Sequence, residues 1–275
     1  MRVVVADNGA GMAETAAGLV EDFLCSAPSP VLGLATGASV QPLYRELVHR
    51  HREGALSFSA AEAFLLDEYI GLDPDHPQLY RNVIHRELTG RIDIDPALVH
   101  SPDVHTADLA DECVRYDRRV VRARIGLQIL GIGRNGHLAF NEPGSPLDSR
   151  TRVVDLTPET REDNSRFFAS LDEVPRRAMT QGLGTIMESE RLLVIAAGCP
   201  KASAVRACLQ GPVTPAIPAS AIRLHPAATV LLDSDVAGLL TFRGEDGAAP
   251  PYRSSEGKES KPIEGALIAA RPGRR

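Results

Sequence analysis

Residues 129–143 read Ile-Leu-Gly-Ile-Gly-Arg-Asn-Gly-His-Leu-Ala-Phe-Asn-Glu-Pro. The apolar start predicts a buried strand, and the three glycines let the chain after it turn sharply and approach a ligand closely. His137 and Glu142 then follow in a loop at the carboxyl end of that strand, where open α/β sheets bind their ligands. Because imidazole transfers protons near neutral pH and a carboxylate can orient it, this stretch predicts an acid–base site.

The same stretch contains the Gly-x-Gly-x-x-Gly spacing of dinucleotide-binding turns. Such a site needs a helix directly after the turn and an acidic residue at the end of the next strand. Here the chain continues with Asn-Glu-Pro and a loop rich in Ser, Asp and Arg, so a dinucleotide site is disfavoured. A purely structural turn stays open, although it would not need His, Asn and Glu together.

Composition narrows the class of protein. The 275 residues, 43% of them hydrophobic, are enough for one large α/β domain with a full core. The net charge of −6 argues against a nucleic-acid partner, and no apolar run approaches the ~20 residues needed to span a bilayer. The sequence enters a strand pattern at once, without a signal peptide, and its four cysteines form no CxxC pair. We therefore expect a cytoplasmic protein with reduced thiols, no metal, no cofactor and no membrane partner.

Short apolar runs alternate with stretches of helical periodicity through most of the chain. We expect strands at 2–6, 31–35, 62–66, 127–132, 153–156, 192–197 and 229–233. We expect helices at 10–25, 41–51, 78–88, 108–124, 157–168, 178–186, 201–209 and 218–224. This alternation predicts a single-domain α/β fold, with a mostly parallel, Rossmann-like sheet and helices on both faces.

From about Phe242 the composition shifts to Gly, Pro, Ser, Glu, Lys and Arg. Segments so poor in apolar residues cannot bury enough surface to fold. We therefore expect residues 1–241 to form the catalytic domain and 242–275 to form a largely disordered tail, in which 263–270 is a candidate for a short docked segment.

A small polar loop, Thr36, Gly37, Ala38 and Ser39, lies between the strand expected at 31–35 and the following helix. Backbone N–H groups and hydroxyls at a helix start can hold an anion. Ser39 could equally be an ordinary helix cap, so both interpretations stay open.

Two basic residues extend the case for an anionic ligand. Lys201 begins a helix after the strand expected at 192–197, and it is one of only three lysines in the chain. A cation opposes the helix dipole at that position, which favours an anionic ligand there. Arg166 stands beside two phenylalanines and is either an anion clamp or a surface arginine.

Asp67 and Glu68 follow the strand expected at 62–66. Successive side chains in extended backbone point to opposite sides, so only one of the two faces a given pocket. Either acid could instead cap a helix or pair with an arginine, and a solvated acidic turn stays open as well. Because parallel strands end at one edge of their sheet, these groups together predict a phosphorylated small substrate and proton-transfer chemistry.

Two stretches carry a specific resemblance: Leu-Asp-Glu-Tyr-Ile-Gly-Leu at 66–72 and the segment 131–143 both resemble the glucosamine-6-phosphate deaminase family. Further matching stretches lie at 34–37, 164–168 and 198–201. The similarity runs in order over roughly residues 1–235 and is most specific from His137 to Pro143. The related sugar-phosphate lactonases share the fold and a Gly-His loop but resemble this chain less after His137.

The resemblance implies an enzyme of amino-sugar catabolism that converts D-glucosamine 6-phosphate and water to D-fructose 6-phosphate and ammonia without a cofactor. It implies that His137, supported by Glu142 and Asn135, opens the pyranose ring, and that Asp67 moves a proton from C2 to C1. It also implies a substrate-binding set, with most of these residues on the phosphate: Thr36, Gly37, Ala38, Ser39, Ala139, Arg166 and Lys201.

Asn135 stands where many members of that family carry aspartate. An amide offers the imidazolium no negative charge, so we expect retained activity with an altered pH profile. Two alternatives are weaker. A 6-phosphogluconolactonase-like lactonase would not need Asp67 as a carbon base, and a non-catalytic sugar-phosphate sensor usually follows a DNA-binding helix-turn-helix, whereas Met1 leads directly into a strand. The sequence leaves open a homo-oligomer.

Overall fold

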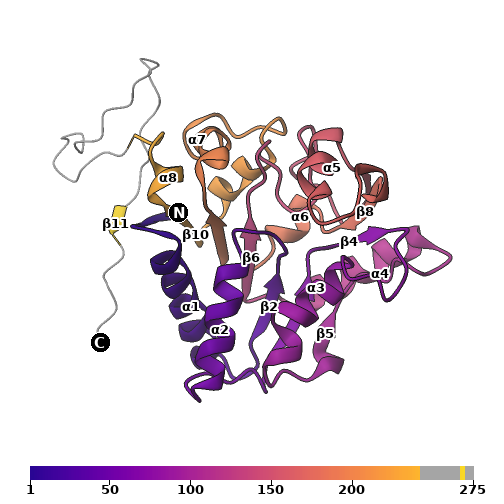
Figure 1. Cartoon of the computed structure of the whole chain (residues 1–275), viewed down its shortest axis with the longest axis horizontal. Coiled ribbons are helices and arrows are strands. Elements are labelled where there is room, and N and C mark those ends of the chain that lie inside the picture. The colour runs from indigo at the N-terminus through magenta and orange to yellow at the C-terminus, as the bar shows by residue number, and fades with distance from the viewer. Residues whose placement is uncertain (242–266, 270–275) are drawn as a thin grey trace.

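The computed structural model describes residues 1–241 and 267–269. A parallel sheet forms its centre, in the order β11-β1-β10-β9-β6-β2-β3-β5. Its strands are β1 (Arg2–Ala6), β2 (Val31–Leu34), β3 (Glu62–Leu65), β5 (Val99–His100), β6 (Leu127–Gly131), β9 (Leu192–Ala196), β10 (Ala228–Asp233) and β11 (Leu267–Ala269). The predicted α/β class with a mostly parallel sheet is confirmed (Figure 1).

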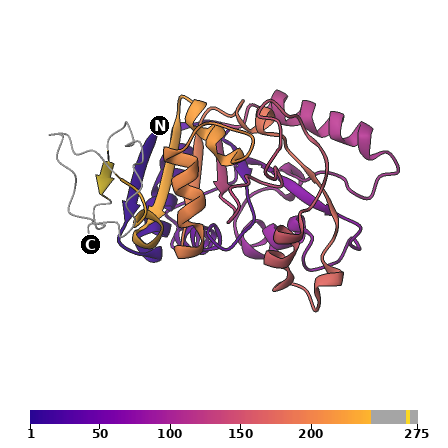
Figure 2. The ribbon, with the colours of Figure 1, turned by 90° about the horizontal axis from the view of Figure 1, so that it is seen from above.

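Helices cover both faces of this sheet. Phe64 on β3 packs with Tyr116 and Val120 of α4, whereas its neighbours Ala63 and Leu65 lie in the main core with α1 and α2. Seen from above, α4 accordingly lies on the other side of the sheet from α1 and α2 (Figure 2). The helices are α1 (Gly9–Ser26), α2 (Gln41–Arg52), α3 (Tyr80–Glu87), α4 (Leu109–Ala123), α5 (Pro158–Ser165), α6 (Leu183–Ile186), α7 (Ala202–Gln210) and α8 (Ser234–Ala237), with 3-10 turns at Cys199–Lys201 and Pro218–Leu224.

A second, antiparallel sheet extends the molecule beyond β3, in the order β4 (Asp67–Ile70), β8 (Arg177–Thr180) and β7 (Arg152–Asp155). The helix predicted over 178–186 is wrong: it is strand β8, a turn, and the short helix α6. Its strand residues Ala178, Met179 and Thr180 are all buried, so they show no alternation that distinguishes strand from helix. Only their pairing with β4 and β7 makes them extended.

The segment beyond Thr241 is described only in part. β11 pairs in parallel with β1, and it falls within the stretch 263–270 that the sequence suggested as a docked segment. The rest of the expected tail, 242–266 and 270–275, lies outside the described residues. None of the described helices combines the length and the hydropathy that a membrane-spanning segment requires.

Candidate active site

A cavity of about 430 Å³ opens at the carboxyl ends of β2, β6 and β9, where the two sheets meet. This volume suits a small-molecule ligand. The cavity is lined by nine of the predicted site residues: Thr36, Gly37, Ala38, Ser39, Asp67, His137, Ala139, Arg166 and Lys201. The other two, Asn135 and Glu142, are absent from its lining, but each contacts His137.

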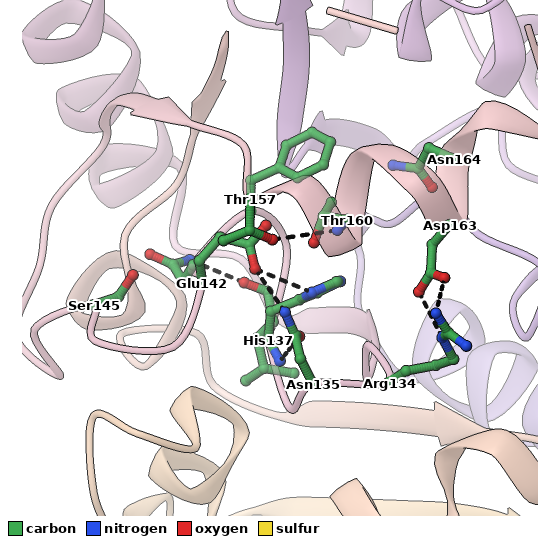
Figure 3. A network of polar contacts seen from close by, with 12 residues as sticks. Arg134, Asn135, His137, Glu142, Ser145, Thr157, Thr160, Asp163 and Asn164 are labelled. Carbon is green, nitrogen blue, oxygen red and sulfur yellow. Dashed lines mark hydrogen bonds and ion pairs between the residues drawn. The ribbon is translucent and has the colours of Figure 1, made fainter. Parts of the chain in front are cut away.

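His137, Asn135 and Glu142 form one polar group in the loop after β6 (Figure 3). Asn135 Nδ2 donates to Glu142 Oε2 at 2.9 Å, and Asn135 Oδ1 accepts from the His137 backbone N–H at 3.1 Å. Glu142 Oε2 lies 3.7 Å from His137 Nδ1, an ion pair once the imidazole is protonated. Burial opposes the charge on Glu142, but contacts with His137, Thr160 and Asn135 outweigh it and lower its pKa to about 2. Glu142 is therefore a carboxylate at neutral pH.

The glycines of this loop explain how the imidazole reaches its position. A Cβ on Gly133 would lie 2.2 Å from Cε1 and 2.3 Å from Nε2 of His137, so the ring packs directly on the Gly133 backbone. Gly136 has φ +85°, a conformation that glycine adopts without strain. Ala139, on the cavity wall, has φ +50° although it carries a side chain, and such strain is commonly stored at functional sites.

Asp67 and Glu68 separate as the alternation of β4 requires. Asp67 lines the cavity, and burial, followed by the nearby charge of Glu68, raises its pKa well above the usual range. Glu68 is fully buried and accepts backbone N–H groups of Tyr69, Tyr80 and Arg81. It therefore caps the start of α3, which is one of the alternatives that the sequence left open for this pair.

Ser39 and Lys201 join the ends of β2 and β9. The helix α2 has no side-chain cap, so Ser39 is not the ordinary cap that the sequence allowed. Instead its Oγ accepts from Lys201 Nζ at 2.9 Å and from the Ala197 N–H at 3.3 Å. Burial and then the charge of Arg166 lower the pKa of Lys201 to about 8. Lys201 and Arg166 both line the cavity, and within the described residues neither forms an ion pair with a carboxylate, so this end of the cavity suits an anion such as phosphate.

Residues 7–231 match the family model described as glucosamine-6-phosphate isomerases/6-phosphogluconolactonase. The chain belongs to this family. Among curated relatives, glucosamine-6-phosphate deaminase from Pseudarthrobacter chlorophenolicus is 49% identical over 87% of this chain and 93% of its own length. Glucosamine-6-phosphate deaminase from Corynebacterium aurimucosum is 48% identical over 88% of this chain and 95% of its own length.

Solved structures agree with the family assignment. A monomeric glucosamine-6-phosphate deaminase superposes with a TM-score of 0.85 at 40% identity and covers 87% of this chain and 100% of its own. The 6-phosphogluconolactonase from Thermotoga maritima has a TM-score of 0.66 at 23% identity, over 85% of this chain and 99% of its own. The second likeness is too distant in sequence to show more than a shared fold.

Several lining residues of this family member were not predicted. Tyr80, at the start of α3, stacks on Phe140 with ring centroids 5.7 Å apart and donates to Tyr69 Oη at 3.3 Å. Tyr80 follows a loop and gives no sequence signal, because only the packing of α3 on β4 brings it to the cavity. Asn164 lies in the matching stretch 164–168, which was a signal, and donates to Tyr69 Oη at 2.8 Å. Three further polar lining residues were not predicted: Thr160 contacts Glu142, and Arg134 and Asp163 form an ion pair between the β6 loop and α5 (Figure 3).

Proposed function

We infer that this chain is a glucosamine-6-phosphate deaminase, which converts D-glucosamine 6-phosphate and water to D-fructose 6-phosphate and ammonia. The assignment is supported by relatives of that name at 49% and 48% identity. The observation that carries the mechanism is that Asp67 and His137 line one cavity together with the cationic end formed by Arg166 and Lys201. One substrate molecule can therefore meet a base, an imidazole and a phosphate site at once.

His137 opens the pyranose ring. It takes the proton of the C1 hydroxyl and gives one to the ring oxygen, which yields the open-chain aldehyde. Glu142 stabilises the imidazolium that forms between these transfers, since its low pKa keeps it ionised. Asn135 holds Glu142 at 2.9 Å and so fixes the direction of that charge.

Asp67 then takes the C2 proton and returns it at C1. The intermediate is an enolamine, and reprotonation at C1 leaves an imine at C2. Water adds to this imine and ammonia leaves. A carbon acid is weak, so the base must be close and shielded from water, and the burial of Asp67 supports this role.

The loop Thr36–Ser39, with Arg166 and Lys201, holds the phosphate, and Ala139 also lines the cavity. Binding energy gained at the phosphate positions the reacting end of the sugar, although the phosphate takes no part in the chemistry. The phosphate-binding residues thus contribute mainly by orienting the substrate.

The substitution Asp67→Asn tests the assignment. We expect ammonia release to fall by about 10²–10⁴-fold, the usual contribution of a general base, with KM for glucosamine 6-phosphate unchanged because the phosphate site is intact. Asp93→Asn, which changes an aspartate remote from the cavity, serves as the control. If wild-type protein instead hydrolysed 6-phosphogluconolactone and released no ammonia, the assignment would be wrong.

Three further features stay proposals. We propose that residues 1–241 are the catalytic domain, since every cavity-lining residue in the part of the chain that the structure describes precedes position 202. A chain ending at Thr241 should therefore keep kcat and KM. The four cysteines are free thiols, which supports a cytoplasmic location, to be tested by cell fractionation. The formation of a homo-oligomer stays a prediction, which a molar mass measured by light scattering would test.

A further inference from the structure

Glu68 is a buried carboxylate to which the proposed reaction gives no part. Its side chain has no solvent exposure, yet it accepts three backbone N–H groups: Oε1 from Tyr69 at 2.9 Å and Tyr80 at 2.7 Å, and Oε2 from Arg81 at 2.9 Å. Burial raises the pKa of Glu68 to about 7, although these three hydrogen bonds favour its ionised form. The two carboxylate oxygens of Glu68 therefore have a specific structural role as hydrogen-bond acceptors.

The role of Glu68 is to join β4 to α3. The residue at the N-cap of α3, Leu79, offers no side-chain oxygen, so the first N–H groups of the helix would be orphaned without Glu68. The same carboxylate is attached to the residue that directly follows Asp67 in the strand. Glu68 thus fixes the start of α3 relative to the base.

Tyr80 is the residue that this junction brings to the cavity. It is the first residue of α3, it lines the cavity together with Asp67, and its ring stacks on Phe140. Its backbone N–H is the donor of the shortest of the three bonds to Glu68. A loosened junction would move the Tyr80 ring and admit water beside Asp67.

We propose that Glu68 is a positioning residue for carbon-proton transfer: it fastens the Asp67 strand to the first turn of α3, so that Tyr80 forms the dry wall beside the base. This inference rests on the proposed function, in which Asp67 abstracts the C2 proton. Burial raises the pKa of Glu68 itself to about 7, so above that pH its negative charge acts in the same direction: a like charge next to Asp67 favours proton uptake by that carboxylate.

The substitution Glu68→Gln tests the proposal. The amide keeps the shape but replaces one acceptor oxygen with a donor, so one N–H group of α3 loses its partner. We expect kcat to fall by about tenfold or more, as when a reacting group is slightly misplaced, with KM for glucosamine 6-phosphate unchanged. The primary isotope effect with C2-deuterated substrate should rise, because proton abstraction becomes more rate-limiting. A residue that only stabilised the fold would not move the isotope effect.

Glu112→Gln is the matched control. Glu112 is also a buried carboxylate; it accepts the Asp103 N–H at 3.0 Å and pairs with Arg115, but it does not line the cavity. We expect kcat, KM and isotope effect of this variant to equal those of the wild type. Equal changes in both variants would overturn the proposal, since they would reflect general loosening.

A double-mutant cycle with Tyr80→Leu tests the route of the effect. We expect Tyr80→Leu to lower kcat and raise the isotope effect, and Glu68→Gln to add little in that background. If Glu68→Gln does not fold, Tyr80→Leu decides alone, and wild-type values for it would overturn the proposal. Absence of ammonia release by the wild type would refute the proposed function instead, whereas a wild-type isotope effect in folded Glu68→Gln would refute only the role of Glu68.

Discussion

Glu142 and Asp67 are both buried carboxylates, yet their surroundings move their pKa values in opposite directions. Polar contacts outweigh burial at Glu142 and lower its pKa to about 2, whereas burial and a like charge raise the pKa of Asp67. A permanently ionised carboxylate suits a partner of an imidazolium, and a basic one suits abstraction of a proton from carbon. The chemical difference between the two residues thus comes from their neighbours.

Asn135→Asp would replace an amide donor with an oxygen close to Glu142, because Asn135 Nδ2 lies 2.9 Å from Glu142 Oε2. Two carboxylates at that distance cannot both ionise easily, so one keeps its proton to higher pH. We expect the acid limb of kcat/KM to shift to higher pH, while the variant stays active. Profiles measured from about pH 5 to 9 should show this shift, and Asn82→Asp, outside the cavity, should not. An unmoved profile for Asn135→Asp would contradict the interpretation.

Lys201 should limit activity at alkaline pH. Because burial lowers its pKa to about 8, the ammonium is charged below that pH and loses its charge above it. We expect kcat/KM to decline above about pH 8 in the wild type, as phosphate affinity weakens. Arginine stays protonated throughout, so Lys201→Arg should lack this limb whatever its absolute rate. A wild-type profile that stays flat well beyond pH 8 would rule out this role for Lys201.

At this scale the sequence predicted those cavity residues that follow strands and carry recognisable motifs. Nine predicted residues line it, and Asn135 and Glu142 contact His137. Tyr80 could not be predicted, since its place depends on how α3 packs against β4. Similarly, the sequence does not show which of the adjacent acids Asp67 and Glu68 caps α3.

At the scale of elements, the sequence predicted most strands of the parallel sheet, although not β5, whereas of the antiparallel sheet it predicted only β7, at 153–156. Strands such as β9 are apolar throughout and buried on both faces, which marks them without knowledge of their partners. β4 contains two acids and β8 is built of small or flexible residues, and neither reads as a strand alone. Their extended form results from pairing between segments far apart in the chain.

The loop after β6 gives a prediction that belongs to an element. Gly133→Ala would place a methyl group 2.2 Å from the His137 ring, so the imidazole must move. We expect kcat to fall on the order of 10²-fold, as for a misplaced catalytic group, with an unchanged circular dichroism spectrum. Gly18→Ala is the control, because a Cβ there has only an ordinary contact at 3.9 Å, with Arg50 Nη1. Equal kcat for both variants would show that the Gly133 contact does not position His137.

At the scale of the whole molecule, the cavity lies where the chain passes from one sheet to the other. Asp67 begins β4 directly after β3 and Leu66, so the base stands at the junction of the two sheets. The junction is held by Gln181, whose N–H donates to Leu66 O at 2.8 Å and whose Nε2 donates to Leu65 O at 3.0 Å. The fold therefore buries the Asp67 carboxylate at the junction of the two sheets. Burial of this charge should reduce the free energy of unfolding of the protein at neutral pH.

Asp67→Asn should for this reason stabilise the protein at neutral pH while it removes activity. The folded-state pKa of Asp67 is raised, so the folded form prefers the protonated acid. Stability from this group is present below the unfolded pKa of about 4 and is lost as pH rises toward the folded pKa. We expect the variant to unfold at a higher temperature than the wild type at pH 7 and the difference to shrink toward pH 4. Asp93→Asn should do the opposite: hydrogen bonds from Ser57 and the Phe58 N–H outweigh burial and lower the Asp93 pKa, so its loss destabilises neutral protein. If Asp67→Asn unfolded at a lower temperature than the wild type at pH 7, the cavity would not oppose the charge that the proposed proton transfer requires.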